Sequence, residues 1–406
     1  WFLFQLILMY LLFIALFDRA FKHDGNKWLA LFGVAWYGLH TANAETINYI
    51  SARSDLLSTF FIVAAMVLFI YSPLARKYFL YLIPFILGSL VKPTALMFAP
   101  LLLVYILLFG EKPILHSLIT FGWAALLYLL QKLLTPATFY PSDIPAFNYL
   151  ITQPFVMLYY FKTFFLPFGL SADYDWPALT GIYNFSFLIG TLFVVGMLIA
   201  AIYLSQEKKW RPVAFGIFWF FIALLPTSSL SPLSEVLNDH RVFFPFVGLM
   251  ISVVWGLGII IYKYEKNVKS SFLLRNSIII IILLILFANA MGAIHRNQVW
   301  RNEESLWYDV TVKSPKNGRG LMNYGLTQMG KGRYDSALQY FTVALQYTPR
   351  YPNLYINLGI ANNAIGKTKE AEESFKKALQ FGPNYYAAYY SYGSWLNDQG
   401  KENEAI

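Results

Sequence analysis

Long apolar runs recur through the first 293 residues of this sequence and limit most strongly what it can fold into. A helix needs about 20 apolar residues to cross a bilayer, and in lipid only helices and closed barrels satisfy their own backbone polar groups. Of the 406 residues, 57% are hydrophobic and 13% are charged, whereas about 25% are charged in soluble proteins. We therefore predict an all-α, polytopic membrane helix bundle of about ten spans. The candidate spans are residues 1–17, 28–40, 56–72, 78–90, 94–109, 113–130, 184–204, 212–225, 244–262 and 277–293.

Basic residues are unevenly shared between the loops that join these runs. One set of loops is 18–27, 73–77, 110–112, 205–211 and 262–276, and the other is 40–55, 91–93, 131–183 and 226–243. The first set carries 13 lysines and arginines and the second carries five, so the positive-inside rule predicts that the first set is cytoplasmic. The longer and more acidic loops of the second set are where we expect the chemistry. This topology also accounts for the net charge of +9, so we predict no nucleic-acid partner.

Two segments leave the number of spans open. In residues 78–109, Lys92 and Pro93 interrupt the apolar run, and each half reaches only about 20–24 Å at 1.5 Å per residue. Residues 149–166 are long enough to span but are also consistent with an amphipathic helix at the interface. Two spans in the first segment with none in the second, or one in each, give the same topology for the rest of the chain.

After residue 293 the sequence repeats with a period of 34. Two glycine series, an alanine series and a proline series keep this spacing: Gly325, Gly359 and Gly393; Gly332, Gly366 and Gly400; Ala337, Ala371 and Ala405; and Pro315, Pro349 and Pro383. This period and these small residues are typical of the tetratricopeptide repeat, a stacked pair of helices. We predict a connector with a partial repeat over 294–317, repeats over 318–351 and 352–385, and a truncated repeat over 386–406. The array follows the last span, so we expect it on the non-cytoplasmic side.

The stretch "HTANAETINYISARSDLLS" (40–58) places charged residues at the mouth of two predicted spans. Each ionisable group at membrane depth costs roughly 2.5–3.5 kcal/mol on insertion scales, so such groups are functional candidates. The alternative is structural. Ser54 or Asp55 would cap a helix that begins at Leu56, and Arg53 would pair with Glu45 or with a lipid phosphate.

The same stretch resembles a segment of the TMTC-type protein O-mannosyltransferases and their bacterial relatives, which reads approximately H-P-x-H-T-E-x-V-x-x-I-x-x-R-x-D-L-L. His40, Glu45, Ile50, Arg53, Asp55, Leu56 and Leu57 match it in register. Thr41 stands where that family usually has proline, and Asn43 where it often has a second histidine. Three further stretches resemble the family in the same order: "LVKPTALMFAPLLLV" (90–104, with Pro93 in place of glutamate), "LPFGLSADYDWP" (166–177) and "LLPTSSLSPLSEVLNDHRVFFPFVGL" (224–249).

The resemblance implies a bundle of glycosyltransferase C type with a C-terminal tetratricopeptide α-solenoid. It implies an inverting enzyme that takes a sugar from a polyprenyl-phosphate carrier and transfers it to an acceptor hydroxyl, such as a protein serine or threonine, on the outer or lumenal face. The main catalytic acid of such enzymes lies in the first outer loop. We expect Trp1 to fall in the second span, so that this acid lies upstream, the sequence is a fragment cut at both ends, and the fragment alone is inactive.

Glycosyl transfer needs a carboxylate to accept the hydroxyl proton and cations to stabilise the departing phosphate, for which arginine is well suited. We predict supporting catalytic roles for Glu45 and Asp55. The predicted carrier-phosphate ligands are Arg53, Lys92, His240 and Arg241, and the predicted acceptor or sugar contacts are His40, Asp173 and Asp175. Structural alternatives remain for several of them: a snorkelling anchor for Arg241 or Lys92, a structural histidine at 240, and a turn before Pro177 for the two aspartates.

The partners that follow from this interpretation are membrane lipid, a polyprenyl-phosphate-linked sugar as donor substrate, and an acceptor protein bound by the repeats. The sequence supports no metal site and no further cofactor, although a divalent metal stays possible. The rival function is a non-enzymatic, membrane-anchored tetratricopeptide scaffold for protein partners. A lipid-linked-sugar transporter would need a continuous polar path, which the few charges in the spans disfavour.

Overall fold

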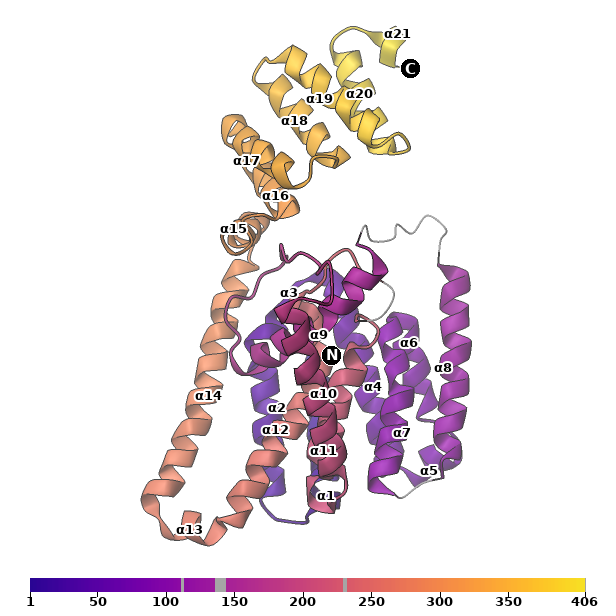
Figure 1. Ribbon diagram of the computed structural model, residues 1–406, viewed down its shortest axis with the longest axis vertical. Helices are drawn as coiled ribbons and strands as arrows, with labels where there is room; N and C mark the ends of the chain where they lie inside the picture. Colours follow the sequence, from indigo (N-terminus) through magenta and orange to yellow (C-terminus); the bar gives the residue numbers. More distant parts are fainter. Residues whose placement is uncertain (111–112, 136–143, 229–231, 406) are drawn as a thin grey trace. The chain divides into compact units, whose positions relative to one another are not determined.

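The computed structural model describes residues 1–110, 113–135, 144–228 and 232–405, and the regular elements within these ranges are all helical. The chain divides into two compact units. The first, which we call the membrane unit, comprises Trp1–Leu170 and Trp176–Asn297. The second, the repeat unit, comprises Ser171–Asp175 and Gln298–Ile406. The predicted all-α class is thus confirmed, and Figure 1 shows the helices of each unit.

Long apolar helices build the membrane unit. Among the described residues, six are long and apolar enough to cross a bilayer, and they include α1, α4, α8, α10, α12 and α14. Their bounds are α1 Phe2–Ala20, α4 Arg53–Tyr71, α8 Leu115–Leu134, α10 Phe185–Ser205, α12 Phe243–Lys263 and α14 Phe272–Val299. Shorter or more polar helices fill the bundle: α2 Asn26–Leu39, α6 Leu82–Val91, α7 Phe98–Phe109, α9 Ala146–Phe165 and α11 Arg211–Leu224. The chain is therefore a multi-pass membrane protein, and the total of about ten spans stays a prediction.

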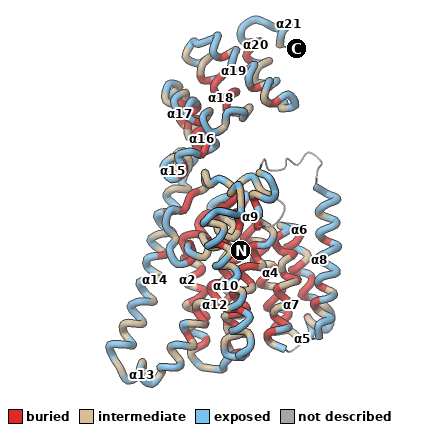
Figure 2. Tube along the Cα trace, viewed as in Figure 1, coloured by how far each residue is buried: buried red, intermediate tan, exposed pale blue. Residues whose placement is uncertain are grey.

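The core of the bundle lies around α11 and α12, whose residues are mostly buried (Figure 2). The two helices meet where Gly216 faces Gly248. A Cβ atom on Gly248 would lie 2.5 Å from the Gly216 carbonyl oxygen, and a Cβ on Gly216 would overlap the Gly248 carbonyl in the same way. Small residues at a helix crossing let two backbones approach closely, which is the usual route to tight packing between membrane helices.

The interrupted segment 78–109 folds as a hairpin. Short helix α5 (Pro73–Lys77) follows α4, and α6 then runs back along α4 until Lys92 reaches Asp55 at the start of α4. The 3₁₀ turn η3 (Pro93–Met97) and α7 return in the opposite direction. This arrangement corresponds to the alternative in which residues 78–109 cross twice.

Helix α9 packs along its length on loop residues. Tyr149 donates a hydrogen bond to the Thr227 carbonyl, Gln153 to the Val236 carbonyl, and Tyr160 to the Asn238 carbonyl. These acceptors belong to the 226–240 loop, which joins α11 to α12. Helix α9 also packs on α10, where Gly190 lies directly against Pro154 and Phe155, and the choice between a span and an interfacial helix for 149–166 stays a prediction.

The last membrane helix, α14, has little protein around it. Only Asn289 and Arg296 are buried among its 28 residues, and both are polar. Short helix α13 (Glu265–Ser270) joins it to α12. The apolar side chains of α14 are largely exposed, as expected for a helix surface that faces lipid.

The repeat unit is a stack of antiparallel helices. Its elements are α15 Glu303–Lys313, α16 Gly318–Met329, α17 Tyr334–Tyr347, α18 Pro352–Ala364, α19 Thr368–Phe381, α20 Tyr386–Asp398 and α21 Glu402–Ala405. Gly325 and Gly359 lie against the rings of Phe341 and Phe375, where an added Cβ would come within 2.5 Å and 2.7 Å of a ring atom. The solenoid predicted from the 34-residue period is confirmed.

A short segment from far away in the sequence, Ser171–Asp175, also belongs to the repeat unit. We call it the strap. Arg319 Nε donates to Asp173 Oδ2 at 2.6 Å, and Ser314 Oγ donates to the Asp173 carbonyl at 3.0 Å. The Lys316 backbone N–H donates to Asp175 Oδ2 at 3.0 Å. The strap thereby fixes the turn that precedes α16.

Candidate functional site

The predicted motif at 40–58 folds as a chain of short helical turns between α2 and α4. His40 ends α2, and η1 (Thr41–Asn43), α3 (Ala44–Asn48) and η2 (Ile50–Ala52) follow. Polar side chains in η1 and α3 are buried, which is unusual for a connecting loop. Helix α4 begins at Arg53, before the expected Leu56, and its first turn has no side-chain cap.

Glu45 is the most deeply buried acid of this segment, with 2% of its surface exposed. Its Oε1 lies 3.0 Å from Nδ1 of His240, 195 residues further along the chain. Its Oε2 is buried and makes no hydrogen bond within the described residues. Burial raises the pKa of the Glu45 carboxyl, and His240 and Arg296 oppose that rise only in part. The pair therefore places a carboxyl group that holds its proton more tightly than usual beside an imidazole.

Arg296 joins this cluster from the far end of α14. Its side chain is buried, with 3% exposed, and its charge acts on Glu45. The next residue, Asn297, accepts a hydrogen bond from Asn48 Nδ2 at 2.7 Å. One turn earlier, Gly292 packs directly on the Thr41 side chain. One face of α14 thus closes over the 41–48 segment.

Arg241, adjacent to His240, contacts the loop that precedes it. Its Nη1 donates to the Glu235 carbonyl at 3.0 Å, while its Nη2 lies 3.9 Å from Glu235 Oε2, too far for a hydrogen bond. The Asn238 amide donates to the same Glu235 carboxylate at 3.1 Å. The guanidinium is therefore held by the Glu235 carbonyl and by the Tyr149 hydroxyl, and its contact with the Glu235 carboxylate is weak.

Asp55 and Lys92 form a second charged pair. Lys92 Nζ lies 2.6 Å and 2.7 Å from the two Asp55 carboxylate oxygens. Asp55 is 6% exposed, and Lys92 lies at the break between α6 and η3. The pairing explains why a lysine is retained in an apolar segment, since each buried charge compensates the other.

His40 takes a structural position at the end of α2. Its Nε2–H donates to the Phe164 carbonyl at 3.0 Å, and its Nδ1 accepts from the Ala42 backbone N–H at 3.3 Å. Its ring stacks on Phe164 and meets Phe246 edge-on. Burial lowers the pKa of His40 to about 4, so the imidazole is neutral at physiological pH. It joins α2, α9 and α12, and a proton on Nδ1 would break the bond that this nitrogen accepts from Ala42.

The other predicted site residues lie apart from the Glu45 cluster. Arg53 is exposed and forms no ion pair within the described residues, so the alternative Glu45–Arg53 pair is absent there. Asp173 and Asp175 belong to the strap and bind the turn before α16. Within residues 1–110, 113–135, 144–228 and 232–405, no three His, Asp or Glu side chains gather as a metal site.

Sequence reasoning brought Glu45 and His240 forward separately but missed their contact, and it missed Arg296 and Glu235. Arg296 lies just beyond the apolar run at 277–293, so it looked like an ordinary flanking charge. Its spacing from Asn289 was the available signal. Two polar residues seven positions apart lie on one face of a helix, and they mark a face that does not contact lipid.

Known proteins match the chain in both units. A family model described as tetratricopeptide repeat matches residues 328–391. The human protein named Protein O-mannosyl-transferase TMTC4 is 25% identical over 240 residues, which is 55% of this chain and 31% of that protein. Protein O-mannosyl-transferase Tmtc2 of Drosophila melanogaster is 29% identical over 140 residues, 34% of this chain and 14% of the relative.

A mouse protein named Protein O-mannosyl-transferase TMTC1 is 23% identical over 225 residues, covering 53% of this chain and 23% of its own length. The matches thus span less than a third of the curated relatives, as the 31% for human TMTC4 illustrates. The names of these relatives agree with the resemblance stated above, and the repeat match agrees with the helices of the repeat unit. Over about half of its length the chain is therefore similar to the TMTC-type proteins, in line with the resemblance stated above.

Proposed function

We propose that this chain is the core of a membrane glycosyltransferase. It would move a sugar, mannose by analogy with the names of its relatives, from a polyprenyl-phosphate carrier to an acceptor hydroxyl on a protein. The reaction would be inverting and of glycosyltransferase C type. The observation that supports the proposal most directly is the buried Glu45–His240 pair, which unites two of the motifs shared with that family.

Glycosyl transfer from a phosphate carrier requires one group that accepts a proton and one that binds an anion. The acceptor oxygen attacks the anomeric carbon, the bond from that carbon to the phosphate oxygen breaks, and the hydroxyl proton must leave. A buried carboxylate with a raised pKa accepts a proton more readily than an exposed one. We assign Glu45 a supporting role at this proton, beside the main carboxylate expected upstream of Trp1; its Oε1 is held by His240 and its Oε2 is free of hydrogen bonds within the described residues. Asp55, held by Lys92, is a supporting carboxylate.

The departing phosphate needs cations close to the proton acceptor. Arg241 follows His240 directly, and its Nη2 lies 3.9 Å from the Glu235 carboxylate, beyond hydrogen-bond distance. A phosphate oxygen could therefore replace a weak contact with a bidentate one, which suits the planar guanidinium. His240 would complete the anion site, and exposed Arg53 and partly exposed Lys92 would meet the phosphate from the first motif.

We place this site and the repeats on the non-cytoplasmic side. The 13-to-five asymmetry in loop charge supports that orientation. The strap adds a topological argument. Residues 171–175, between α9 and α10, share one unit with residues 298–406, so the 166–184 loop and the repeats must lie on one side of the membrane. The repeats would bind the acceptor protein, because stacked helix pairs form a concave binding surface.

The test is the variant Glu45→Gln in the natural protein, assayed with mannosyl polyprenyl phosphate and an acceptor peptide. We expect transfer to fall at least about tenfold, the scale of one charge-assisted contact. The melting temperature should stay close to wild type because Gln keeps the size and one hydrogen-bonding oxygen. Glu207→Gln, in an exposed loop pair with Lys209, is the matched control and should transfer sugar normally.

Unchanged transfer by Glu45→Gln would remove the proposed role of this carboxylate. Equal losses of activity and stability would make the Glu45–His240 pair a structural tie. If wild type transfers no sugar to any hydroxyl but still captures a protein through its repeats, the scaffold function would replace the enzymatic one.

A further inference from the structure

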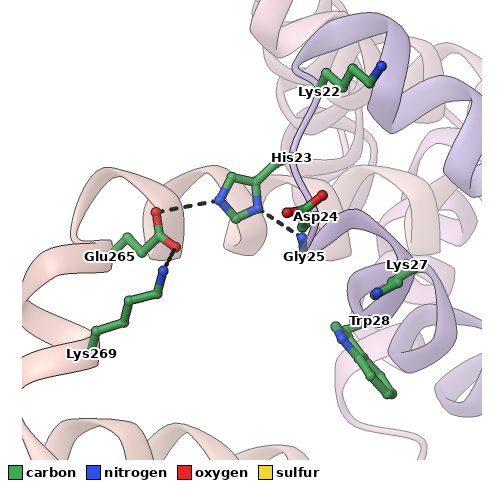
Figure 3. Close-up of a pocket in the computed structure, with 8 residues that line it drawn as sticks. All are labelled: Lys22, His23, Asp24, Gly25, Lys27, Trp28, Glu265 and Lys269. Carbon is green, nitrogen blue, oxygen red and sulfur yellow. Dashed lines mark hydrogen bonds and ion pairs between the residues drawn. The ribbon is translucent and has the colours of Figure 1, made fainter.

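A second polar site lies at the opposite end of the membrane unit from Glu45. The turn between α1 and α2 and the helix α13 line an open cavity of about 540 Å³. Its lining comprises Lys22, His23, Asp24, Gly25, Lys27, Trp28, Glu265 and Lys269 (Figure 3). None of these residues belongs to the motifs shared with the glycosyltransferase family.

The walls of this cavity are fixed by contacts within the membrane unit. Tyr262 donates to Asn26 Oδ1 at 3.0 Å, and its ring centre lies 3.9 Å from that of His23. Gly25 comes so close to Tyr262 that an added Cβ would lie 2.7 Å from the hydroxyl oxygen. The end of α12 therefore shapes the α1–α2 turn, and the cavity is not a gap between loosely placed loops.

One wall of the cavity holds a hydrogen-bonded chain. The Gly25 backbone N–H donates to His23 Nδ1 at 3.0 Å, so His23 Nε2 carries a proton and faces Glu265 Oε2 at 3.4 Å. Lys269 Nζ binds the other Glu265 oxygen at 2.6 Å. Glu265 is therefore already compensated by two neighbours, and its charge is not available to attract a cation.

The opposite wall holds cations without acidic partners. Lys22 and Lys27 form no ion pair within the described residues, and Lys27 lies 5.9 Å from the Trp28 ring centre. Figure 3 shows Lys27 and Trp28 across the opening from the Glu265–Lys269 pair. The flanking segments 18–27 and 262–276 carry seven lysines and arginines against three acids. The lining also holds Asp24, but its three lysines, Lys22, Lys27 and Lys269, outnumber its two acids, so the net positive charge favours an anion.

The position of the cavity points to the source of that anion. It lies where α1 ends, α2 begins, α12 ends and α14 begins, which is the level of a membrane–water interface. Trp28 is 66% exposed there, and exposed tryptophans at span ends lie among lipid head groups. Basic pockets between membrane helices bind anionic head groups. The loops that form it are also in the set predicted to be cytoplasmic.

We propose that this cavity binds the head-group phosphate of an anionic phospholipid, with Lys27 and Lys269 as its two main contacts. Lys269 would share its ammonium group between Glu265 and the phosphate, and Trp28 would pack on the glycerol region. The site is independent of the glycosyltransferase proposal, because it uses different residues at the other end of the unit.

The experiment uses the natural protein in vesicles of phosphatidylcholine with a minor fraction of phosphatidylglycerol. Lipid retained after gentle extraction is counted by native mass spectrometry. The variant Lys27→Gln with Lys269→Gln is compared with Lys263→Gln with Lys266→Gln, which removes the same charge from the neighbouring stretch but not from the cavity lining. We expect wild type and the second pair to retain one phosphatidylglycerol, and the first pair to retain it at least about tenfold less.

Two further arms make the assignment specific. Lys27→Gln alone breaks no ion pair and should already reduce retention, which separates loss of binding from loss of the Glu265–Lys269 pair. In pure phosphatidylcholine, no lipid should be retained at this level, and inorganic phosphate should not displace phosphatidylglycerol. Equal retention by both double variants would overturn the site. Displacement by inorganic phosphate would overturn the lipid assignment in favour of a soluble anion.

Discussion

The two units of this chain solve the same packing problem over very different sequence distances. In the repeat unit, Gly325 receives the ring of Phe341 and Gly359 receives that of Phe375, each 16 positions away. In the membrane unit, Gly216 meets Gly248 at the crossing of two helices, and Glu45 meets His240 across 195 residues. Repeat contacts are local and recur with the period, whereas bundle contacts occur once. A local defect should therefore stay local in the first case and spread in the second.

The largest expected effect follows from the glycine crossing of α11 and α12. In Gly216→Ala the new Cβ would overlap the Gly248 carbonyl oxygen, which belongs to a backbone and cannot rotate away. The helices must separate, which we expect to lower the free energy of unfolding by about 3 kcal/mol or more. Thermal unfolding in detergent and the yield of folded protein measure this loss.

The matched control is Gly196→Ala in α10. That position has open space around its Cβ, and alanine forms helix better than glycine. Its melting temperature should equal or exceed that of wild type. If Gly216→Ala had the same melting temperature as Gly196→Ala, the α11–α12 crossing would have room for a methyl group. The contrast between the two units would then weaken.

The difference between the units also explains what the sequence could predict. The repeats could be predicted because their contacts recur at a fixed spacing, so the 34-residue period indicated the stacked helix pairs. The structure adds that Gly332, Gly366 and Gly400 have positive φ angles at the turns. The apolar runs predicted the membrane helices for a similar reason, since length and hydrophobicity are local properties.

The site could be predicted only in part, because its geometry is not local. The motif at 40–58 brought Glu45 and Asp55 forward, but nothing in it indicates that Glu45 contacts His240 or that Asp55 contacts Lys92. Arg296 was missed altogether because it follows an apolar run and resembles a flanking anchor. Buried charged residues that are far apart in the sequence compensate each other in the folded protein. A single sequence shows each of these residues but not which residue pairs with which.

The second prediction tests a non-local contact of the membrane unit through pH. His40 is favoured in its neutral form in the folded protein, with a pKa lowered from 6.5 to about 4. Its contribution to stability is therefore fully present above pH 6.5 and is lost as the pH falls from 6.5 toward 4. A loss on the order of 3 kcal/mol follows from that shift.

The measurement compares melting temperatures of wild type and His40→Gln between pH 7.5 and 4. Glutamine does not titrate and can still donate to the Phe164 carbonyl, so the variant should be less sensitive to acid than wild type. Parallel pH curves for the two proteins would show that His40 is not the titrating group.

The third prediction concerns a local contact of the repeat unit. In Gly359→Ala the new Cβ would lie 2.7 Å from the Phe375 ring, which has to shift within a stack of helices. We expect a loss of about 2 kcal/mol, confined to α18, α19 and their neighbours. Hydrogen exchange should become faster there and stay unchanged in α11 and α12. Gly330→Ala, where the nearest atom is 3.5 Å away, should have little effect. Faster exchange throughout the membrane unit would contradict the local character of the repeats.

The smallest effect is expected at the strap, the one described segment that brings a non-local contact into the repeat unit. Asp173 is 2% exposed and accepts a charge-assisted bond from Arg319, whose own side chain is 45% exposed. Asp173→Asn keeps the backbone bond from Ser314 but removes the carboxylate charge. Because solvent screens the arginine, we expect a loss of only about 1 kcal/mol. Hydrogen exchange should accelerate in α15 and α16 and not in α18 to α20, since a repeat contacts only its neighbours. Asp175→Asn, whose carboxylate accepts a single exposed backbone bond from Lys316, is the control and should change exchange less. If both variants left α15 and α16 unchanged, the strap would lie on the repeats without stabilising them, and the repeat unit would be held together by local contacts alone.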